Sequence, residues 1–433
     1  MSLAERDKKN VWHPYSTFSQ DKSPIVIVKA EGTYLFDENE KKYMDAISSW
    51  WVNTHGHSHP YLLKKINEQF KKLEHVIFAG FTHQAAIELS ERLLKKLPSV
   101  QSKIFFSDDG STAVEVALKM ALQYNHNKGE KKNKIIAFNN AYHGDTFGAM
   151  SVSGRTSFTD PFKNLLFEVL FIDVPVKGNE DASISQLEKI LKEEENTAAF
   201  IFEPLVQGAG GMIMYNAEAL DKMIMLCNKH NVITIADEVF TGFGRTGKFF
   251  AADYLDNKPD IFCLSKGLTG GVMPLGVTSC SEKIHTAFTG NDKLKTFFHG
   301  HSFTANPLAC AAALASMDLM GDPETWKNII RISEKNKKYG TEIQNAFCQN
   351  EKNKKIKEVR WIGTILAIEL FNTEATSYFN TLRDKAYSYF IDKGILMRPL
   401  GNVIYIVPPY CITDNDLDYI YDTITEFINI QNV

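Results

Sequence analysis

Short apolar runs alternate with helical stretches between residues 100 and 280, and this alternation constrains the fold most strongly. The runs KIFFS, KIIAF, AAFIFEP, VITIADEV, IFCLSK and GVTSC are typical of buried strands, and helical spacing separates several of them, as in Ala113–Tyr124 and Ala217–His230. Strands that alternate with helices indicate βαβ units. We therefore predict an α/β fold with a mostly parallel sheet flanked by helices, and ligands at the carboxyl ends of its strands.

The pattern changes after residue 325. A charged helix at Glu324–Gln349 precedes the strand-like run EVRWIGTILAIEL, and a helix at Thr373–Lys393 and a strand at NVIYIVPP follow, which is typical of a smaller α+β domain. Near the N-terminus, IVIVKAEGTYLFDENEKKYMDA predicts a hairpin that turns at Asp37–Lys41, and a helix begins at Pro60. We expect three parts: an N-terminal segment at 1–60 that packs with the small domain, a large domain at 61–325 and a C-terminal small domain at 326–433.

Charge and cysteine content narrow the class of protein. A net charge of −4 and a pI of about 6.3 argue against a dedicated nucleic-acid or anionic-membrane surface. The chain starts without an apolar signal segment, and no long uncharged apolar run predicts a transmembrane helix. No two cysteines have C-x-x-C spacing, so we expect free thiols and a cytoplasmic protein. The cysteines are Cys227, Cys263, Cys280, Cys310, Cys348 and Cys411.

Two charged residues that follow buried strands are candidates for chemistry. Asp237 ends an apolar run in IADEVFTGFGRTGKFF, and Lys266 directly follows another in IFCLSKGLTGGVMPLG. A buried carboxylate is costly unless a cation, such as a protonated pyridine nitrogen, pairs with it. A desolvated lysine has a lowered pKa and attacks carbonyl groups. For Asp237 the alternative is a structural ion pair with Arg245. Arg245 itself could bind a substrate carboxylate, because it lies in a glycine-rich loop. For Lys266 the alternative is a side chain at a strand end that extends to solvent.

Two polar turns that lead into helices are candidate phosphate sites. In SDDGSTAVEVALK, a turn with Gly110 and Ser111 joins a strand to a helix, and backbone N–H groups at a helix N-terminus attract anions. The alternative is an ordinary helix cap, because Ser and Thr are good capping residues. The segment HGHSFTANPLACAAA, around Gly300–Ser302, is a second candidate for the same reason.

Aromatic and histidine residues add further candidates. Tyr142 or His143, in NAYHGDTFGAMSVSG, could stack on an aromatic cofactor ring, and the alternative is a turn that covers the edge of the sheet. His55, His57 and His59 alternate along the chain. No cysteine or paired carboxylate lies near them in the sequence, so we interpret them as loop histidines rather than metal ligands.

The segments ADEVFTGFGRTGKFFA and LSKGLTGGVMPLG resemble the class III aminotransferases of fold type I, and the resemblance extends over nearly the whole chain. Within that family, WHPYS, SSWWVNTHGHSHP, DDGSTAVEVALKMALQY, YHGDTFGAMSVSG, QGAGGM and NPLACAAA are similar to members that aminate 8-amino-7-oxononanoate in biotin biosynthesis. General ω-aminotransferases usually have Glu where Ala209 stands and often have Arg where Asp145 stands. Both differences favour the biotin-pathway branch.

The resemblance implies a fold-type I transferase with a seven-stranded sheet, and pyridoxal 5′-phosphate (PLP) as its cofactor. It implies that Lys266 carries the cofactor as a Schiff base and shuttles the proton, and that Asp237 pairs with the pyridine nitrogen. Gly110 and Ser111 would hold the phosphate, and Tyr142 would flank the ring.

The resemblance also implies a homodimer with its active site at the subunit interface. His301 and Ser302 would reach the phosphate from the partner subunit, although the family's usual turn is Gly-Pro-Thr where this chain has Gly300-His301-Ser302. Ser302 keeps the hydroxyl group of that turn. The substrate-contacting positions that the resemblance implies are Tyr15, Trp50, Tyr142, Arg245, Lys266, Gly300 and Arg398.

The implied reaction has two halves. S-adenosylmethionine would donate an amino group through PLP, and 8-amino-7-oxononanoate would receive it to give 7,8-diaminononanoate. The alternatives are lysine as the donor, another class III aminotransferase that acts on an ω-amino acid or diamine, and a non-catalytic regulatory protein with this fold. We expect no metal, nucleic-acid or membrane partner.

Overall fold

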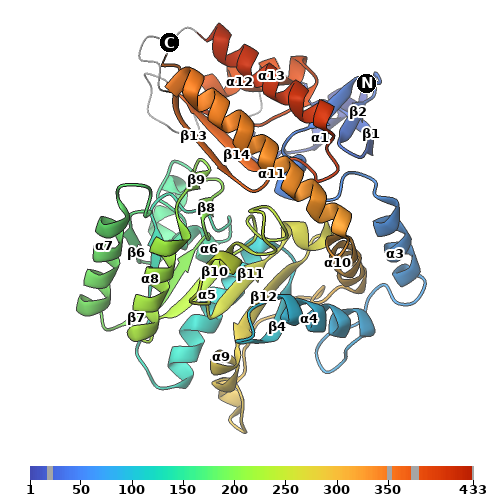
Figure 1. Ribbon diagram of the computed structural model, residues 1–433. Helices are drawn as coiled ribbons and strands as arrows, with labels where there is room; N and C mark the ends of the chain where they lie inside the picture. Colours follow the sequence, from blue (N-terminus) through green and yellow to red (C-terminus); the bar gives the residue numbers. More distant parts are fainter. Residues whose placement is uncertain (17–22, 349–353, 372–379, 432–433) are drawn as a thin grey trace.

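A seven-stranded sheet forms the centre of the molecule (Figure 1). The computed structural model describes residues 1–16, 23–348, 354–371 and 380–431. The strand order is β4-β12-β11-β10-β7-β5-β6, in which β12 is antiparallel to both neighbours and the other pairings are parallel. The predicted α/β fold with a mostly parallel sheet is confirmed. The strands span Gln101–Ser107 (β4), Gly276–Ser281 (β12), Ile261–Leu264 (β11), Ile233–Asp237 (β10), Thr197–Phe202 (β7), Lys134–Phe138 (β5) and Val169–Ile172 (β6).

Different helices cover the two faces of this sheet, because side chains alternate along each strand. Ile136 and Phe138 of β5 pack with helices α4, α7 and α8, whereas Ile135 and Ala137 of the same strand pack with α5 and α6. Since both faces are buried, the strands have nearly continuous apolar sequences, which is why they could be predicted. The helices span Gln84–Lys96 (α4), Gly110–Asn127 (α5), Phe147–Val152 (α6), Glu180–Glu193 (α7) and Ala217–Lys229 (α8).

A three-stranded antiparallel sheet lies in the C-terminal part of the chain, in the order β13-β14-β16. The strand-like run EVRWIGTILAIEL forms two strands, because the chain reverses at Gly363 (φ 53°) to form a hairpin. The predicted helix at Thr373–Lys393 is described only from Leu382, since 372–379 lie outside the described residues. The elements span Ile356–Ile362 (β13), Ile365–Leu370 (β14), Val403–Ile406 (β16), Pro323–Ile343 (α11), Leu382–Asp392 (α12) and Asp414–Ile430 (α13).

A third sheet joins the two ends of the chain. The predicted hairpin at Asp37–Lys41 is confirmed, and its second strand, β3, pairs in parallel with β15 from the C-terminal part. This pairing supports our proposal that the N-terminal segment packs with the small domain; the division at residues 60 and 325 stays a prediction. The sheet has the order β1-β2-β3-β15, with strands at Ile27–Glu31 (β1), Tyr34–Asp37 (β2), Lys42–Asp45 (β3) and Ile395–Leu396 (β15).

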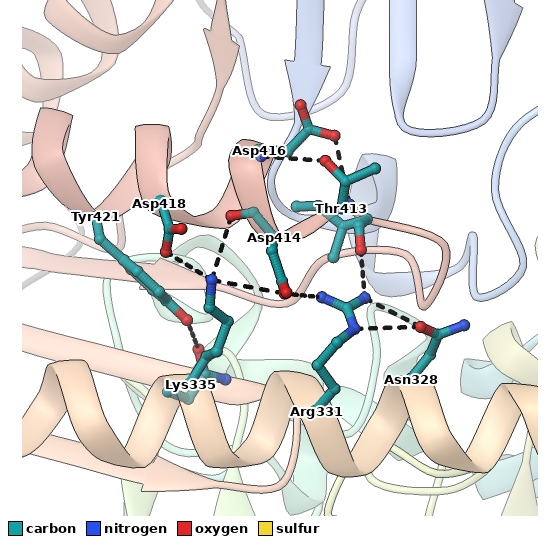
Figure 2. Close-up of polar contacts among 10 residues, drawn as sticks. Asn328, Arg331, Lys335, Thr413, Asp414, Asp416, Asp418 and Tyr421 are labelled. Atoms are coloured by element: carbon teal, nitrogen blue, oxygen red, sulfur yellow. Dashed lines mark hydrogen bonds and ion pairs between the residues drawn. The ribbon is translucent and has the colours of Figure 1, made fainter.

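Helices α11 and α13 are connected by a polar network at the surface (Figure 2). Arg331 of α11 donates to a carboxylate oxygen of Asp414 and to the carbonyl oxygen of Ile412. One turn further along α11, Lys335 contacts Asp414 and lies 2.7 Å from Asp418. Asp414 and Asp418 lie in the first turns of α13, so the two cations set the position of that helix against α11.

The other described elements range from short strands to the largely buried helix at Pro307–Met320. The helix predicted from Pro60 is confirmed as α3 (Pro60–Phe70). All six cysteines are free, as expected. Within the described ranges, no helix is both long and apolar enough to cross a membrane. The remaining elements are Leu3–Asn10 (α1), Ser48–Trp51 (α2), Glu282–Thr286 (α9), Pro307–Met320 (α10), Val206–Gln207 (β8) and Ile213–Met214 (β9).

Candidate active site

A cavity of about 640 Å³ lies at the carboxyl ends of the central strands. Asp237 is the last residue of β10, Lys266 follows β11, and Tyr142 follows β5; all three line the cavity. Gly110 and Ser111 line it from the first turn of α5. The cavity therefore occupies the edge of the sheet where ligands were predicted.

Lys266 combines an unusual backbone with an amine held away from bulk water. Its φ of 45° lies in the left-handed region, which is costly for a residue with a side chain and occurs most often at functional sites. The Nζ atom lies 4.5 Å from the centre of the Trp51 ring. Burial lowers the pKa of Lys266 to about 8, although the charges of Asp237 and Glu203 oppose this shift. A larger fraction of this amine is therefore neutral near pH 7 than of an exposed lysine, which makes it a better nucleophile.

Asp237 is buried and paired with His143. Its Oδ2 atom lies 2.7 Å from His143 Nδ1, and Oδ1 accepts a hydrogen bond from the Val239 N–H. Since an ionised carboxylate can only accept, Nδ1 of His143 donates. The other ring nitrogen of His143 is buried and has no partner among the described residues. The partner of Asp237 is thus His143, and the alternative of an ion pair with Arg245 is wrong.

The start of α5 lines the cavity, and an aspartate caps it. Asp109 caps the helix by accepting from the Thr112 N–H at 2.7 Å, so neither Ser111 nor Thr112 serves as the N-cap residue. The Ser111 hydroxyl accepts instead from the Thr146 N–H at 3.1 Å. The helix itself supplies no acceptors for the N–H groups of its first turn, and its dipole favours a negative charge there. A side chain at Gly110 would meet Val239 at 2.6 Å, which explains the glycine.

Aromatic side chains from three segments gather beside the cavity. The Tyr15 hydroxyl bonds to Asp145 and lies 3.2 Å from the Tyr142 hydroxyl. Tyr15 also meets Trp50 edge to face, with ring centres 5.6 Å apart. The Arg398 guanidinium lies 4.9 Å from the centre of the Trp50 ring. The structure thus brings together residues that are up to 383 positions apart in the chain.

The comparisons with known proteins agree with this geometry. The family model described as aminotransferase class-III matches residues 15–428. The chain belongs to the class III aminotransferases. It is 43% identical to the adenosylmethionine-8-amino-7-oxononanoate aminotransferase of Synechococcus elongatus, across 97% of this chain and 98% of that protein.

Two solved structures of aminotransferases have the same fold. The crystal structure of adenosylmethionine-8-amino-7-oxononanoate aminotransferase from Methanocaldococcus jannaschii matches with a TM-score of 0.92 and 35% identity, over 100% of this chain and 99% of that one. An amine transaminase from an uncultivated Pseudomonas species, solved in its PLP-bound form, matches with a TM-score of 0.89 and 29% identity, over 96% and 97% of the two chains.

Seven predicted site residues of this class III aminotransferase do not line the cavity: Tyr15, Trp50, Arg245, Gly300, His301, Ser302 and Arg398. Arg245 is buried behind it, where its guanidinium donates to the carbonyl oxygens of Pro408 (2.9 Å) and Trp51 (3.2 Å). It therefore contacts the backbone of a cavity residue, Trp51, rather than the cavity itself. Gly300, His301 and Ser302 form a turn before α10, and they too are absent from the lining of the cavity in their own chain.

Two of the cavity residues that sequence reasoning did not single out lie against predicted site residues. Glu203 is buried and accepts from the N–H groups of Tyr142 (3.0 Å) and Gly208 (2.9 Å), and burial raises its pKa to about 7. It thereby fixes the backbone that carries Tyr142. The other residue is Trp51, whose ring lies beside the Lys266 amine. The apolar runs before EPLV and around SSWW mark both positions as buried, but nothing in the sequence places them beside Lys266.

Proposed function

We propose that this class III aminotransferase uses PLP to transfer the amino group of S-adenosylmethionine to 8-amino-7-oxononanoate, which gives 7,8-diaminononanoate for biotin biosynthesis. One observation carries the proposal. Lys266 and Asp237, at the ends of adjacent strands, line one cavity in a chain that is 43% identical to an enzyme named for these two substrates.

The residues that line the cavity fit PLP. The Lys266 amine, with its lowered pKa, can bond to an aldehyde carbon. The buried carboxylate of Asp237 suits a protonated ring nitrogen, and His143 holds it in place. The first turn of α5, with Gly110 and Ser111, suits a phosphate group. When bound, PLP supplies an electron sink for the charge that develops on the carbon that bears the amino group.

The protein's own groups would move the proton and hold the charges. We assign to Lys266 Nζ the transfer of the proton that leaves the amino-bearing carbon of the donor, since this amine is neutral above about pH 8. The His143 N–H donates to the Asp237 carboxylate and would hold it in place beside the ring nitrogen. Glu203 holds the Tyr142 backbone against the cavity.

The wall beside the cavity suits two unlike substrates. Tyr15, Trp50 and Tyr142 offer ring faces and edges that accept different carbon skeletons. Asp145 places a carboxylate beside Tyr15, which favours cationic groups such as the amines of both substrates. Arg398 supplies a planar cation beside Trp50 that suits a substrate carboxylate.

A second copy of the chain would complete the site. The turn at Gly300–Ser302 does not line its own cavity, and Phe303, which follows it, is 63% exposed. An exposed aromatic residue next to a polar turn suits a subunit interface. We therefore propose a homodimer, located in the cytoplasm, in which the turn of one subunit approaches the phosphate in the other.

Absorbance of the purified protein tests the proposal. We expect a visible cofactor band that S-adenosylmethionine alone abolishes and 8-amino-7-oxononanoate restores. Loss of the band with lysine alone would keep the pathway and change the donor. A band that responds to neither donor would contradict the proposed substrates, and a protein that takes up no PLP would contradict the proposed cofactor.

A further inference from the structure

The two tryptophans of the site belong to a segment with a costly backbone conformation. In Ser48–Trp51 (α2), three residues have positive φ angles: 51° at Ser48, 62° at Ser49 and 68° at Trp51. None is a glycine, so each costs free energy and persists only where the surroundings determine it. Trp50 stands beside Tyr15 and Arg398, and Trp51 lies beside the Lys266 amine.

The Asp45 carboxylate stabilises this backbone by accepting hydrogen bonds from it. It is fully buried, and its Oδ1 atom accepts from the N–H groups of Ser49 (2.8 Å) and Ile47 (3.3 Å). Its Oδ2 atom accepts from the Ser49 hydroxyl at 2.8 Å. Ser49 therefore donates to Asp45 from both its backbone N–H and its hydroxyl group. These two hydrogen bonds stabilise the left-handed conformation of Ser49.

His57 fixes that carboxylate in turn. Its Nε2 atom lies 2.9 Å from Asp45 Oδ2, and its Nδ1 atom lies 2.9 Å from the Asn53 amide nitrogen. Because an amide nitrogen only donates, Nδ1 accepts and the ring proton is on Nε2, which donates to Asp45. The His57 backbone is held by two hydrogen bonds to Gly32, at 2.7 and 3.1 Å. The ring is thus anchored to the N-terminal sheet.

Other hydrogen bonds hold the two ends of the segment, whereas Ser49 bonds to Asp45. The Ser48 hydroxyl donates to the Val407 carbonyl oxygen at 2.7 Å, and the Trp51 indole N–H donates to the Tyr405 hydroxyl at 3.1 Å. Ser49 lies between them, and among the described residues its polar contacts are with Asp45 alone. The turn that separates Trp50 from Ser48 therefore depends on this carboxylate.

We propose that Asp45 and His57 are positioning residues of the active site. The buried pair holds residues 48–51 so that Trp50 lies beside Tyr15 and Arg398 and Trp51 lies beside the Lys266 amine. This assigns a role to the middle histidine of HGHSHP, which the sequence alone marked only as a loop residue. Substrate contact by Trp50 rests on the proposed function; the effect of the pair on the tryptophan geometry does not.

The test compares two substitutions of His57 in the holoenzyme. His57→Leu removes the donor to Asp45, whereas the side-chain amide of His57→Gln can still donate. We expect His57→Leu to raise KM for both substrates about tenfold and to leave kcat within about threefold. A displaced Trp50 would weaken substrate binding more than it would slow the chemical step. His57→Gln should restore KM to within about threefold of the wild type. His126→Leu, at an exposed histidine in the last turn of α5, is the matched control and should change neither constant.

Two results would overturn the proposal. One is an unchanged KM in His57→Leu. The other is a KM that is raised equally in His57→Leu and His57→Gln although both variants fold, because the amide of Gln can still donate to Asp45. If His57→Leu does not fold, Ser49→Ala decides: it removes only the hydroxyl donor to Asp45, so a raised KM supports the proposal and an unchanged KM overturns it.

A spectroscopic measurement separates this proposal from the proposed function. Trp50→Phe identifies the part of the near-ultraviolet circular dichroism that comes from Trp50. We expect His57→Leu to lose that part and His57→Gln to keep it. If the wild type turns over neither substrate, the proposed function fails, and the positioning role is still judged by this signal. A Trp50 signal that survives in His57→Leu would contradict the role.

Discussion

The reactivity of Lys266 depends on the protonation of its amine. Only the neutral amine attacks the PLP aldehyde, and burial lowers the pKa of Lys266 to about 8 from 10.5. The rate of PLP uptake by the apoprotein should therefore rise about tenfold between pH 7 and pH 9 and then level off. Stopped-flow absorbance measures this rate, with Lys266→Arg as the background for attachment to other lysines. A rate that keeps rising about tenfold per pH unit up to pH 10 would show that the pKa is not lowered.

Gly110 tests the phosphate end of the cavity. Since a Cβ atom there would meet Val239 Cγ1 at 2.6 Å, Gly110→Ala should push the first turn of α5 away from β10. Such overpacking costs about 1–3 kcal/mol, so we expect the Kd for PLP to rise by about 5- to 150-fold. Adding Val239→Ala should recover most of the loss, and equilibrium dialysis of the cofactor measures both effects. If Gly110→Ala binds PLP as the wild type does, the first turn of α5 is not the phosphate site.

Sequence reasoning reached some of these residues and not others for a physical reason. Asp237 and Lys266 could be predicted because each is a charged residue at the end of an apolar run, where burial demands a partner or a task. His143 was considered only as a residue that could stack on a ring, and Glu203 was not singled out although it ends the apolar run AAFIFEP. Their roles depend on contacts with residues 94 and 61 positions away, and only the folded chain creates those contacts.

At the scale of elements, the network of Figure 2 connects α11 to α13 without touching the cavity. Arg331 is mostly buried, but its partner Asp414 is 56% exposed, so solvent screens much of their attraction. We expect Arg331→Met to lower the free energy of unfolding by about 1 kcal/mol and to leave kcat and KM unchanged. Chemical denaturation and steady-state kinetics measure the two effects.

Lys327 provides the control on the same helix. Its ion pair with Glu324 is exposed at both ends, so Lys327→Met should have little effect on stability. Equal decreases in the free energy of unfolding in Arg331→Met and Lys327→Met would mean that the bonds from α11 to α13 stabilise the fold no more than an exposed ion pair does.

Elements with a strong periodic signal were predictable, and their partners were not. The strands of the central sheet have apolar runs of the right length, yet the insertion of β12 between β4 and β11 depends on long-range pairing. The hairpin at Gly363 was missed because apolar residues continue on both sides of the turn, with only Gly363 and Thr364 between the strands. The pairing of β3 with β15 joins residues about 350 positions apart, which no local pattern encodes.

At the scale of the whole molecule, the proposed dimer predicts that each active site needs two chains. Lys266 and the Gly300–Ser302 turn would act in the same site only when they come from different subunits. A heterodimer of Lys266→Ala with Ser302→Asp then keeps one intact site, built from the wild-type Lys266 of one chain and the wild-type turn of the other. We expect about half the wild-type kcat per dimer, while each homodimeric parent is inactive. Two affinity tags on co-expressed chains allow this heterodimer to be purified and assayed.

The reciprocal arrangement makes the test decisive. When one chain carries both Lys266→Ala and Ser302→Asp and the other is wild type, a turn that crosses the interface damages both sites. One site lacks the lysine, and the other receives the aspartate, whose negative charge repels the phosphate. We therefore expect almost no activity from this second heterodimer. If the turn served its own subunit instead, the wild-type chain would keep a complete site, so the second heterodimer would show about half the activity and the first would show none.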